Sequence, residues 1–174
     1  MKWLFIIVGG LVGLVAIVAL IGAMLPKGHV AKRSAKYKQS AEAIWTTITD
    51  FASAPSWRTE LQSVAQLPDR NGHAVWLERS KHGPMPYEVT VIEPPQKMVT
   101  KIISDDLPFG GTWTYEIQDL EQTCVLTITE EGEIYNPIFR FLARFIFGYH
   151  ATMESYLKAL GKKFGEESVI ILEG

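Results

Sequence analysis

Six stretches of the chain alternate apolar and polar residues with a period of two, and short turn-forming segments separate them. They cover residues 61–67, 74–80, 87–92, 97–103, 112–118 and 123–131. Such alternation is typical of strands that bury one face, and connections this short join antiparallel neighbours. Asn71-Gly72, between the first two stretches, is a strong hairpin signal. The sequence therefore predicts a six-stranded antiparallel meander.

One further strand and two short helices are predicted before the meander. Residues 29–39 (HVAKRSAKYKQ) alternate like the later strands. Ser40 suits the N-cap of a helix over residues 41–49, whose apolar residues share one face. Pro55 disfavours a helical conformation at the residue before it, so the chain must bend or begin a second short helix there.

A long amphipathic helix is predicted at the C-terminal end of the domain. Asn136 and Pro137 suit its N-cap and its first position. From there to Phe164, apolar residues recur every three or four positions, and charged residues fall on the other side. The apolar face is widened near the start of the helix by Phe139, Phe141, Ile146 and Phe147. This excess of large apolar residues would line a cavity or touch lipid.

The N-terminal apolar run is long enough to cross a membrane. Residues 3–25 hold no charged side chain in 23 positions, and as a helix they would extend about 35 Å against a hydrocarbon core of about 30 Å. We therefore expect a single-pass transmembrane anchor. A cleaved signal peptide, with its cleavage site at residues 21–23, is the alternative. Gly9 and Gly13 have the GxxxG spacing, which favours at most a weak homodimer through the anchor.

The chain is expected to divide into three parts. Residues 1–28 would form the anchor and a short linker, residues 29–166 a ligand-binding domain, and residues 167–174 a C-terminal tail. Basic residues follow the anchor closely, at Lys27, Lys32, Arg33, Lys36 and Lys38. By the positive-inside rule they favour a cytoplasmic domain. The alternative is that most of these lysines are simply the wet face of the first strand, which leaves the orientation open.

The composition argues against several classes of function. The formal net charge is −2, which gives no basis for binding nucleic acid. The single cysteine, Cys124, cannot form an intramolecular disulfide and lies in an apolar stretch, so we expect a buried thiol. The histidines lack the spacing of a metal site; they are His29, His73, His82 and His150. We expect no metal and no cofactor.

The order of these elements resembles one family of proteins. The segments that carry the likeness are AEAIWTTITDFASAPSW (41–57), YEVTVIEPPQKMVTKI (87–102), GGTWTYEI (110–117) and EEGEIYNPIFRFLARFIFG (130–148). They are similar to the START-related helix-grip superfamily (SRPBCC), in its polyketide cyclase/dehydrase and lipid-transport-like branch. The resemblance implies an α+β fold in which a seven-stranded curved antiparallel sheet grips the long C-terminal helix. It also implies an apolar cavity between sheet and helix for lipids, isoprenoids or polyketides, and no catalytic residues common to the family.

Strand alternation and the helical stripe indicate which side chains would face this cavity. A curved antiparallel sheet cannot close fully around one helix, and the remaining opening is a natural ligand site. We expect ten residues to line it: Trp57, Trp76, Tyr87, Val89, Met98, Trp113, Tyr115, Leu126, Phe145 and Tyr149. Whether the large aromatic side chains fill the cavity or line it is open at this stage.

Two carboxylates are weak candidates for chemistry inside the cavity. Glu130 shares parity with the inward residues of its strand, unless the strand ends there and Glu130 faces water. Glu78 shares parity with Trp76, on a strand whose inward face is ambiguous. A buried carboxylate can act as a general acid or base.

These features favour a membrane-anchored binding protein for a hydrophobic small molecule such as a lipid, an isoprenoid or a polyketide-like compound. An enzyme of the cyclase, dehydratase or hydrolase type, acting on an aromatic or polyketide-like substrate, is the first alternative. A partner-binding scaffold without a ligand is the second.

Overall fold

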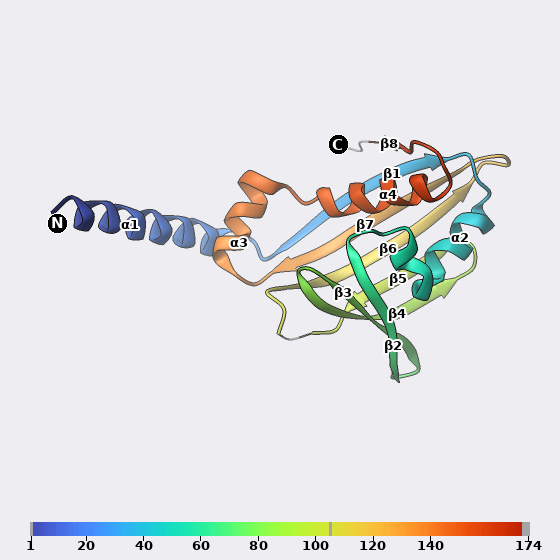
Figure 1. The fold of residues 1–174 in the computed structure, drawn as a ribbon, viewed down its shortest axis with the longest axis horizontal. Helices are drawn as coiled ribbons and strands as arrows, with labels where there is room; N and C mark the ends of the chain where they lie inside the picture. The colour runs from blue at the N-terminus through green and yellow to red at the C-terminus, as the bar shows by residue number, and fades with distance from the viewer. Residues whose placement is uncertain (1, 105, 172–174) are drawn as a thin grey trace.

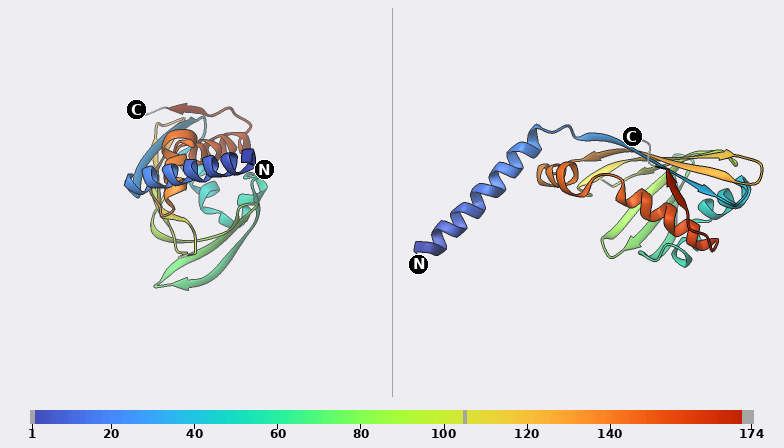
Figure 2. Two further views of the ribbon diagram at one scale, coloured as in Figure 1. Left: turned by 90° about the vertical axis from the view of Figure 1, so that its left-hand side faces the viewer. Right: turned by 90° about the horizontal axis from the view of Figure 1, so that it is seen from above.

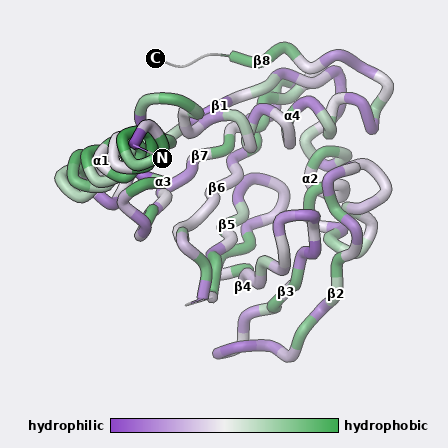
Figure 3. The backbone as a smooth tube through the Cα atoms, turned by 60° about the vertical axis from the view of Figure 1, so that its left-hand side comes forward, coloured by the Kyte–Doolittle hydropathy of each residue, from purple (hydrophilic) through white to green (hydrophobic). Residues whose placement is uncertain are grey.

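Residues 2–104 and 106–171 are described by a computed structural model, in which an N-terminal helix extends from an α+β domain (Figure 1). This helix, α1 (Lys2–Met24), is hydrophobic along almost its whole length, whereas the strands of the domain alternate in character (Figure 3). Its side chains are exposed except near its C-terminal end. By length and composition α1 suits either a membrane anchor or a signal sequence.

The strands form one curved antiparallel sheet in the order β2-β3-β4-β5-β6-β7-β1-β8 (Figure 1). They are β1 (Gly28–Tyr37), β2 (Leu61–Arg70), β3 (His73–Ser80), β4 (Gly83–Glu93), β5 (Lys97–Ile102), β6 (Phe109–Asp119), β7 (Cys124–Ile134) and β8 (Val169–Ile171). The helix-grip sheet is confirmed, with eight strands instead of the predicted seven. The extra strand β8 falls in the segment expected to be a tail. Its β-branched residues pair with the edge of β1, which would otherwise be open.

β6 and β7 run further than the sequence pattern predicted. Each has 11 residues, and they pair along their whole length. Gly111 makes the extension possible, because its φ is 132° and a Cβ there would overlap the Glu131 carbonyl oxygen. Glu130 therefore lies within the paired sheet, and not at the end of a strand.

Two short helices follow β1, as predicted. α2 (Ala41–Thr49) begins at Ser40, whose Oγ accepts a hydrogen bond from the backbone amide three residues later at 3.2 Å. η1 (Phe51–Ser56) is a 3-10 helix that accommodates the predicted bend. It ends at Trp57, and so delivers this ring and the following Arg58 to the concave side of the sheet.

The C-terminal helical segment is divided into parts that run in different directions (Figure 1). α3 (Pro137–Leu142) continues into η2 (Ala143–Phe147), a turn of π-helix, and the chain then breaks before α4 (Ala151–Lys163). Gly148 makes the break, because its φ of 71° and ψ of −177° are accessible only to glycine. The prediction of one continuous helix is wrong in this respect.

The core lies between α4 and the sheet. α2 and α4 lie on the same side of the sheet, which is its concave side, whereas α3 lies beside the end of α1 (Figure 1, Figure 2). From α4, Met153, Leu157 and Leu160 are completely buried. The sheet contributes residues of the same cluster, among them Ala35, Tyr37, Met98, Leu126 and Ile128. Cys124 is buried here too, as predicted.

Candidate ligand-binding site

The residues predicted to line a cavity lie on the concave face, with one exception. Six are buried: Trp57, Tyr87, Val89, Met98, Tyr115 and Leu126. Three are half-buried and pack against the core: Trp76, Trp113 and Tyr149. The exception is Phe145, which lies in η2 before the break and is 59% exposed. Its assignment to the cavity is therefore wrong, whereas ligand contact by the other nine residues stays a prediction.

Tyr156 of α4 lies at the centre of the aromatic side chains. Its ring centroid is 5.3 Å from that of Trp57, 5.8 Å from that of Tyr115 and 6.0 Å from that of Trp113. Edge-on and tilted ring contacts at these distances are favourable. The sequence placed Tyr156 only on the apolar stripe of a helix, and its central position depends on neighbours that are distant in the chain.

A buried ion pair lies beside this aromatic group. Arg58 Nη1 donates a hydrogen bond to Oε1 of Glu78 at 2.5 Å, and Nη2 donates one to Oε2 at 3.2 Å. Glu78 is 6% exposed and points inward, which resolves the ambiguous face of β3. The Arg58 guanidinium carbon lies 5.2 Å from the ring centroid of Tyr156. We call Arg58, Glu78, Tyr87, Tyr115 and Tyr156 the Arg58 cluster.

Electrostatics fix the protonation states of this cluster. Burial alone would lower the pKa of the Arg58 guanidinium, but the charge of Glu78 raises it overall, so Arg58 stays charged. Burial raises the pKa of Tyr87, Tyr115 and Tyr156, and the nearby Glu78 charge adds to the rise. These hydroxyls therefore stay protonated near neutral pH, where they can donate or accept hydrogen bonds but cannot act as bases.

A second polar group joins β1, β6 and β7. Nε2 of His29 lies 2.9 Å from Oε1 of Glu130, and the indole N–H of Trp113 donates to Oε2 at 2.7 Å. The His29 ring stacks on Tyr149, with centroids 3.9 Å apart. Of the two interpretations of Glu130, the inward one is correct, because β7 continues four residues beyond it. We call His29, Trp113, Glu130 and Tyr149 the His29 cluster; its Trp113 ring touches Tyr156 of the Arg58 cluster.

Three buried polar atoms on this face have no hydrogen-bond partner among the described residues. They are Nε1 of Trp57, Nε1 of Trp76 and Nδ1 of His29. Buried polar atoms in proteins nearly always have a partner, whether protein or water. An acceptor on a bound molecule could serve the two indole N–H groups, so these atoms mark where a ligand would be held. Within residues 2–104 and 106–171, no three His, Cys, Asp or Glu side chains gather into a metal site.

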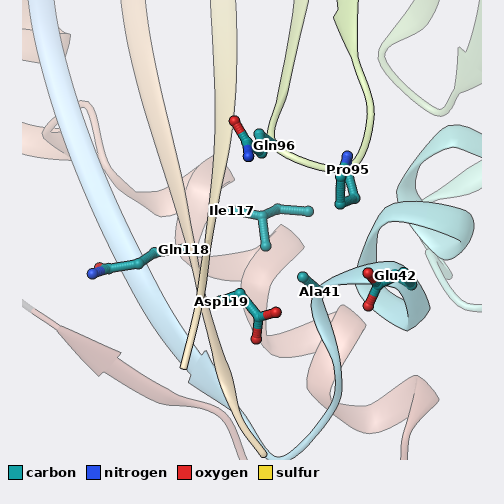
Figure 4. Close-up of a pocket in the computed structure, with 7 residues that line it drawn as sticks. All are labelled: Ala41, Glu42, Pro95, Gln96, Ile117, Gln118 and Asp119. Atoms are coloured by element: carbon teal, nitrogen blue, oxygen red, sulfur yellow. The ribbon is translucent and has the colours of Figure 1, made fainter. Parts of the chain in front are cut away.

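A separate pocket of about 470 Å³ lies at the end of the domain beside α2 (Figure 4). It is lined by Ala41, Glu42, Pro95, Gln96, Ile117, Gln118 and Asp119. Four of these seven side chains are polar or charged, and none belongs to the predicted cavity. This pocket is therefore separate from the predicted ligand site.

The sequence matches the family model described as polyketide cyclase / dehydrase and lipid transport over residues 29–164, which span the domain from β1 through α4. The chain belongs to this family. The START-related resemblance inferred from the sequence is thereby confirmed. No curated protein sequence matches the chain closely enough to count as a relative.

Solved structures of similar shape cover most of the domain. A conserved protein from Geobacillus kaustophilus has a TM-score of 0.67 at 15% identity, over 83% of this chain and 100% of that one. A START superfamily protein from Mycobacterium smegmatis has a TM-score of 0.58 at 20% identity, over 78% and 96%. Truncated norcoclaurine synthase from Thalictrum flavum has a TM-score of 0.63 at 12% identity, over 80% and 95%.

These likenesses establish the helix-grip fold but do not transfer an activity, because all three identities are low. Family and fold together support a hydrophobic ligand-binding architecture. What this chain does therefore depends on the Arg58 cluster, the His29 cluster and the unpartnered atoms of the concave face.

Proposed function

We propose that the protein binds a hydrophobic small molecule on the concave face of its sheet, and that α1 anchors it in the membrane that supplies this molecule. One observation carries the proposal: the unpartnered Nε1 atoms of Trp57 and Trp76 and Nδ1 of His29 all lie on that aromatic face. The family supports the hydrophobic nature of the ligand.

A ligand with an apolar body and at least one oxygen acceptor fits this face best, as in a lipid, an isoprenoid or a polyketide-like compound. Leaving a buried donor without a partner costs about 1–3 kcal/mol, and an acceptor on the ligand would remove this cost. The apolar body would lie against residues such as Met98 and Val89, and gain about 25 cal/mol for each Å² removed from water.

Entry of the ligand would require side chains to move, because the rings around Tyr156 contact one another directly. Trp76, Trp113 and Tyr149 are half-buried and mark the rim where this movement would begin. Rotamer changes of this kind are common when a site is filled. The pairing of Arg58 with Glu78 would keep the floor of the site rigid meanwhile.

The proposed role of α1 is to keep the binding face next to the bilayer, which raises the local concentration of a membrane-dissolved ligand. We propose a cytoplasmic domain, because Lys27 and the basic residues of β1 favour that side by the positive-inside rule. Gly9 and Gly13 have open space where a Cβ would be, which leaves their face free for weak contact with a second copy.

Native mass spectrometry of the full chain released from lipid nanodiscs tests the proposal. We expect a bound small molecule on the unmodified protein. In a variant with Trp57→Phe and Trp76→Phe, the fraction of protein that carries the molecule should fall about tenfold. This fall corresponds to a loss of about 1.4 kcal/mol of binding free energy. Trp45→Phe, on α2, is the matched control. An unmodified protein that stays empty after exposure to lipid extract, or equal occupancy in all three proteins, would refute the proposal and favour a partner-binding scaffold.

A cyclase, dehydratase or hydrolase-type activity is the second candidate, and the His29–Glu130 contact of 2.9 Å favours it. An imidazole and a carboxylate in contact beside an apolar face can move a proton between them and a substrate. The molecules bound to the unmodified protein and to Glu130→Gln, purified from the same cells, distinguish the two functions. Molecules of equal mass and equal fragmentation mean binding alone. A mass lower by one water on the unmodified protein means that Glu130 takes part in a dehydration, a lost fragment means a hydrolysis, and an equal mass with a different fragmentation pattern means a cyclisation.

A further inference from the structure

α3 and η2 expose a group of large apolar side chains immediately beside the end of α1. We define Phe139, Phe145, Ile146 and Phe147 as the apolar patch. All four are more than half exposed, and Phe147 reaches 65%. A cluster of this kind on a short segment marks a surface that contacts another molecule or a membrane.

Packing and hydrogen bonds attach the patch-bearing segment to α1. A Cβ on Gly22 would overlap the backbone carbonyl of Pro137, so the two helices touch backbone to backbone. Arg140 Nη1 donates to the Leu25 carbonyl oxygen at 2.9 Å, and Nη2 donates to that of Tyr135 at 3.1 Å. Arg140 is buried in this position. The segment therefore has a fixed place relative to the end of α1.

That place lies at the level of the membrane surface if α1 spans the bilayer. Gly22 is two residues from the end of α1 at Met24, which is about 3 Å along a helix axis. α1 is about 35 Å long, only slightly more than a hydrocarbon core of about 30 Å. α3 therefore begins within about one helical turn of the point where α1 leaves the hydrocarbon.

We propose that the apolar patch inserts into the interfacial layer of the bilayer that α1 crosses, so that α3 and η2 lie on the membrane surface. The occupant is lipid and not protein, because the patch continues the surface of a helix whose own side chains require lipid. Arg144, exposed on the same segment, is suited to the headgroup layer, as in other interfacial helices. The proposal rests on the membrane anchor that is part of the proposed function.

Membrane contact of the apolar patch would bring the rim of the concave face close to the bilayer. The patch ends at Phe147, and only Gly148 separates it from Tyr149, whose ring stacks on His29. A lipid-bound η2 would therefore place the half-buried rim of the concave face next to the bilayer. A hydrophobic molecule could then pass between bilayer and binding face without crossing bulk water.

Depth-dependent fluorescence quenching of the full chain tests this inference. Phe147→Cys carries an environment-sensitive NBD label, and the protein is reconstituted in vesicles of phosphatidylcholine and phosphatidylglycerol with lipids that bear a doxyl quencher. Val169→Cys, on β8 and 68% exposed, is the control for exposure alone. Val12→Cys, in the middle of α1, reports whether α1 spans. Burial raises the pKa of the native Cys124 thiol to about 11, so the unmodified protein should take up little label.

We expect the label at 147 to emit at shorter wavelength than the label at 169, and to be quenched several-fold more strongly by shallow doxyl groups. If the label at position 12 is quenched but the label at 147 behaves like the label at 169, the patch does not contact the membrane, whereas α1 still spans it. Absence of quenching at 12 would overturn both. The label at 147 could also be shielded from water without being quenched, and become exposed when the protein is diluted in lipid. That result would overturn lipid contact and favour contact with a second copy of the chain.

Discussion

α3–η2 and α4 are two halves of a single stretch of apolar, helix-forming sequence, and they use their apolar residues in opposite ways. α4 turns its stripe onto the sheet, so that Leu157 is 0% exposed. α3–η2 turns most of its large side chains outward, as the exposure of Phe145 and Phe147 shows. Gly148 separates the two halves, and each points toward a different neighbour (Figure 1).

The difference teaches that an apolar stripe defines what a helix avoids, namely water, and not what it contacts. α4 contacts a sheet that supplies a complementary surface, with Tyr156 against Trp57, Trp113 and Tyr115. α3–η2 contacts α1 through Pro137 and Arg140, and its remaining apolar surface is available for lipid. The fold holds one half, and we infer that the bilayer holds the other.

The largest expected difference in stability comes from replacing one large apolar side chain by alanine in each half. Leu157→Ala should lower the free energy of unfolding by about 4 kcal/mol, because it leaves a cavity in a fully buried site. Phe147→Ala should change it by no more than about 0.5 kcal/mol, because its side chain is exposed. Urea unfolding of both variants in detergent micelles, followed by circular dichroism, measures the contrast. Equal losses would contradict the division between the halves.

The surface on which α4 rests gives the next largest effect. Glu78→Gln removes the buried counter-charge of the Arg58 guanidinium and leaves it only the more exposed Glu60, so the variant should lower the free energy of unfolding by about 3 kcal/mol. The double variant Arg58→Met, Glu78→Gln removes the unpaired charge and should regain part of the stability. The same urea experiment tests this prediction. If the double variant loses as much free energy of unfolding as Glu78→Gln and Arg58→Met lose together, or more, the two residues are not coupled as described.

The break between the halves can itself be altered. Gly148→Ala keeps the space free, since nothing lies within 4 Å, but forces alanine into a backbone conformation reserved for glycine. We expect the free energy of unfolding to fall by about 1–3 kcal/mol. Thermal unfolding measures this change, and Gly10→Ala in α1 is the control. A stabilised variant with higher helix content would mean that α3–η2 and α4 fuse readily, and that the break is not enforced by the surrounding packing.

Acidification should produce the smallest change in stability, and of the two halves only α4 should respond. A hydrogen bond from Arg33 lowers the pKa of Glu154, and burial lowers the pKa of His150. Groups whose pKa is depressed by folding stabilise the protein above their ordinary pKa, and this stabilisation is lost as pH falls. Hydrogen exchange in α4 should therefore speed up relative to the intrinsic rate in two steps, one as the pH falls below the ordinary His pKa of about 6.5 and one as it falls below the ordinary Glu pKa of about 4.5. Residues 137–147 hold no group that titrates in this range.

In Glu154→Gln the lower of the two steps should disappear while the His150 step remains. An identical pH response in α3–η2 and α4, or an unchanged response in the variant, would contradict the assignment of the effect to these side chains.

Sequence reasoning predicted what depends on local pattern. The strands, the two short helices and the inward face of most strands follow from alternation and caps within about ten residues. The break at Gly148 was missed because the apolar stripe continues on both sides of it, and Phe145 was misplaced as a result. The sequence leaves the orientation of Glu130 open, because the polar residues that follow it hide the true end of β7.

The polar part of the site depends on distant pairs, which no local pattern shows. Arg58 follows η1, and its partner Glu78 lies on β3, 20 residues further along the chain. The central place of Tyr156 requires rings from η1, β6 and α4 to converge. His29 lies at the start of the first strand and meets Glu130 because β1 pairs with β7, the last strand of the meander.

The central claim is that a ligand supplies partners for the unpartnered indoles of the concave face. Nitrogen-15 correlation spectra of the full chain in nanodiscs report each of the five tryptophan indole N–H groups separately, with assignments from single Trp→Phe variants. On addition of the molecule recovered from the native protein, we expect the Trp57 and Trp76 indole protons to shift downfield, as they do on gaining an acceptor. Shifts confined to Trp3 in α1, or no shift at Trp57 and Trp76 while the molecule remains bound, would contradict the account.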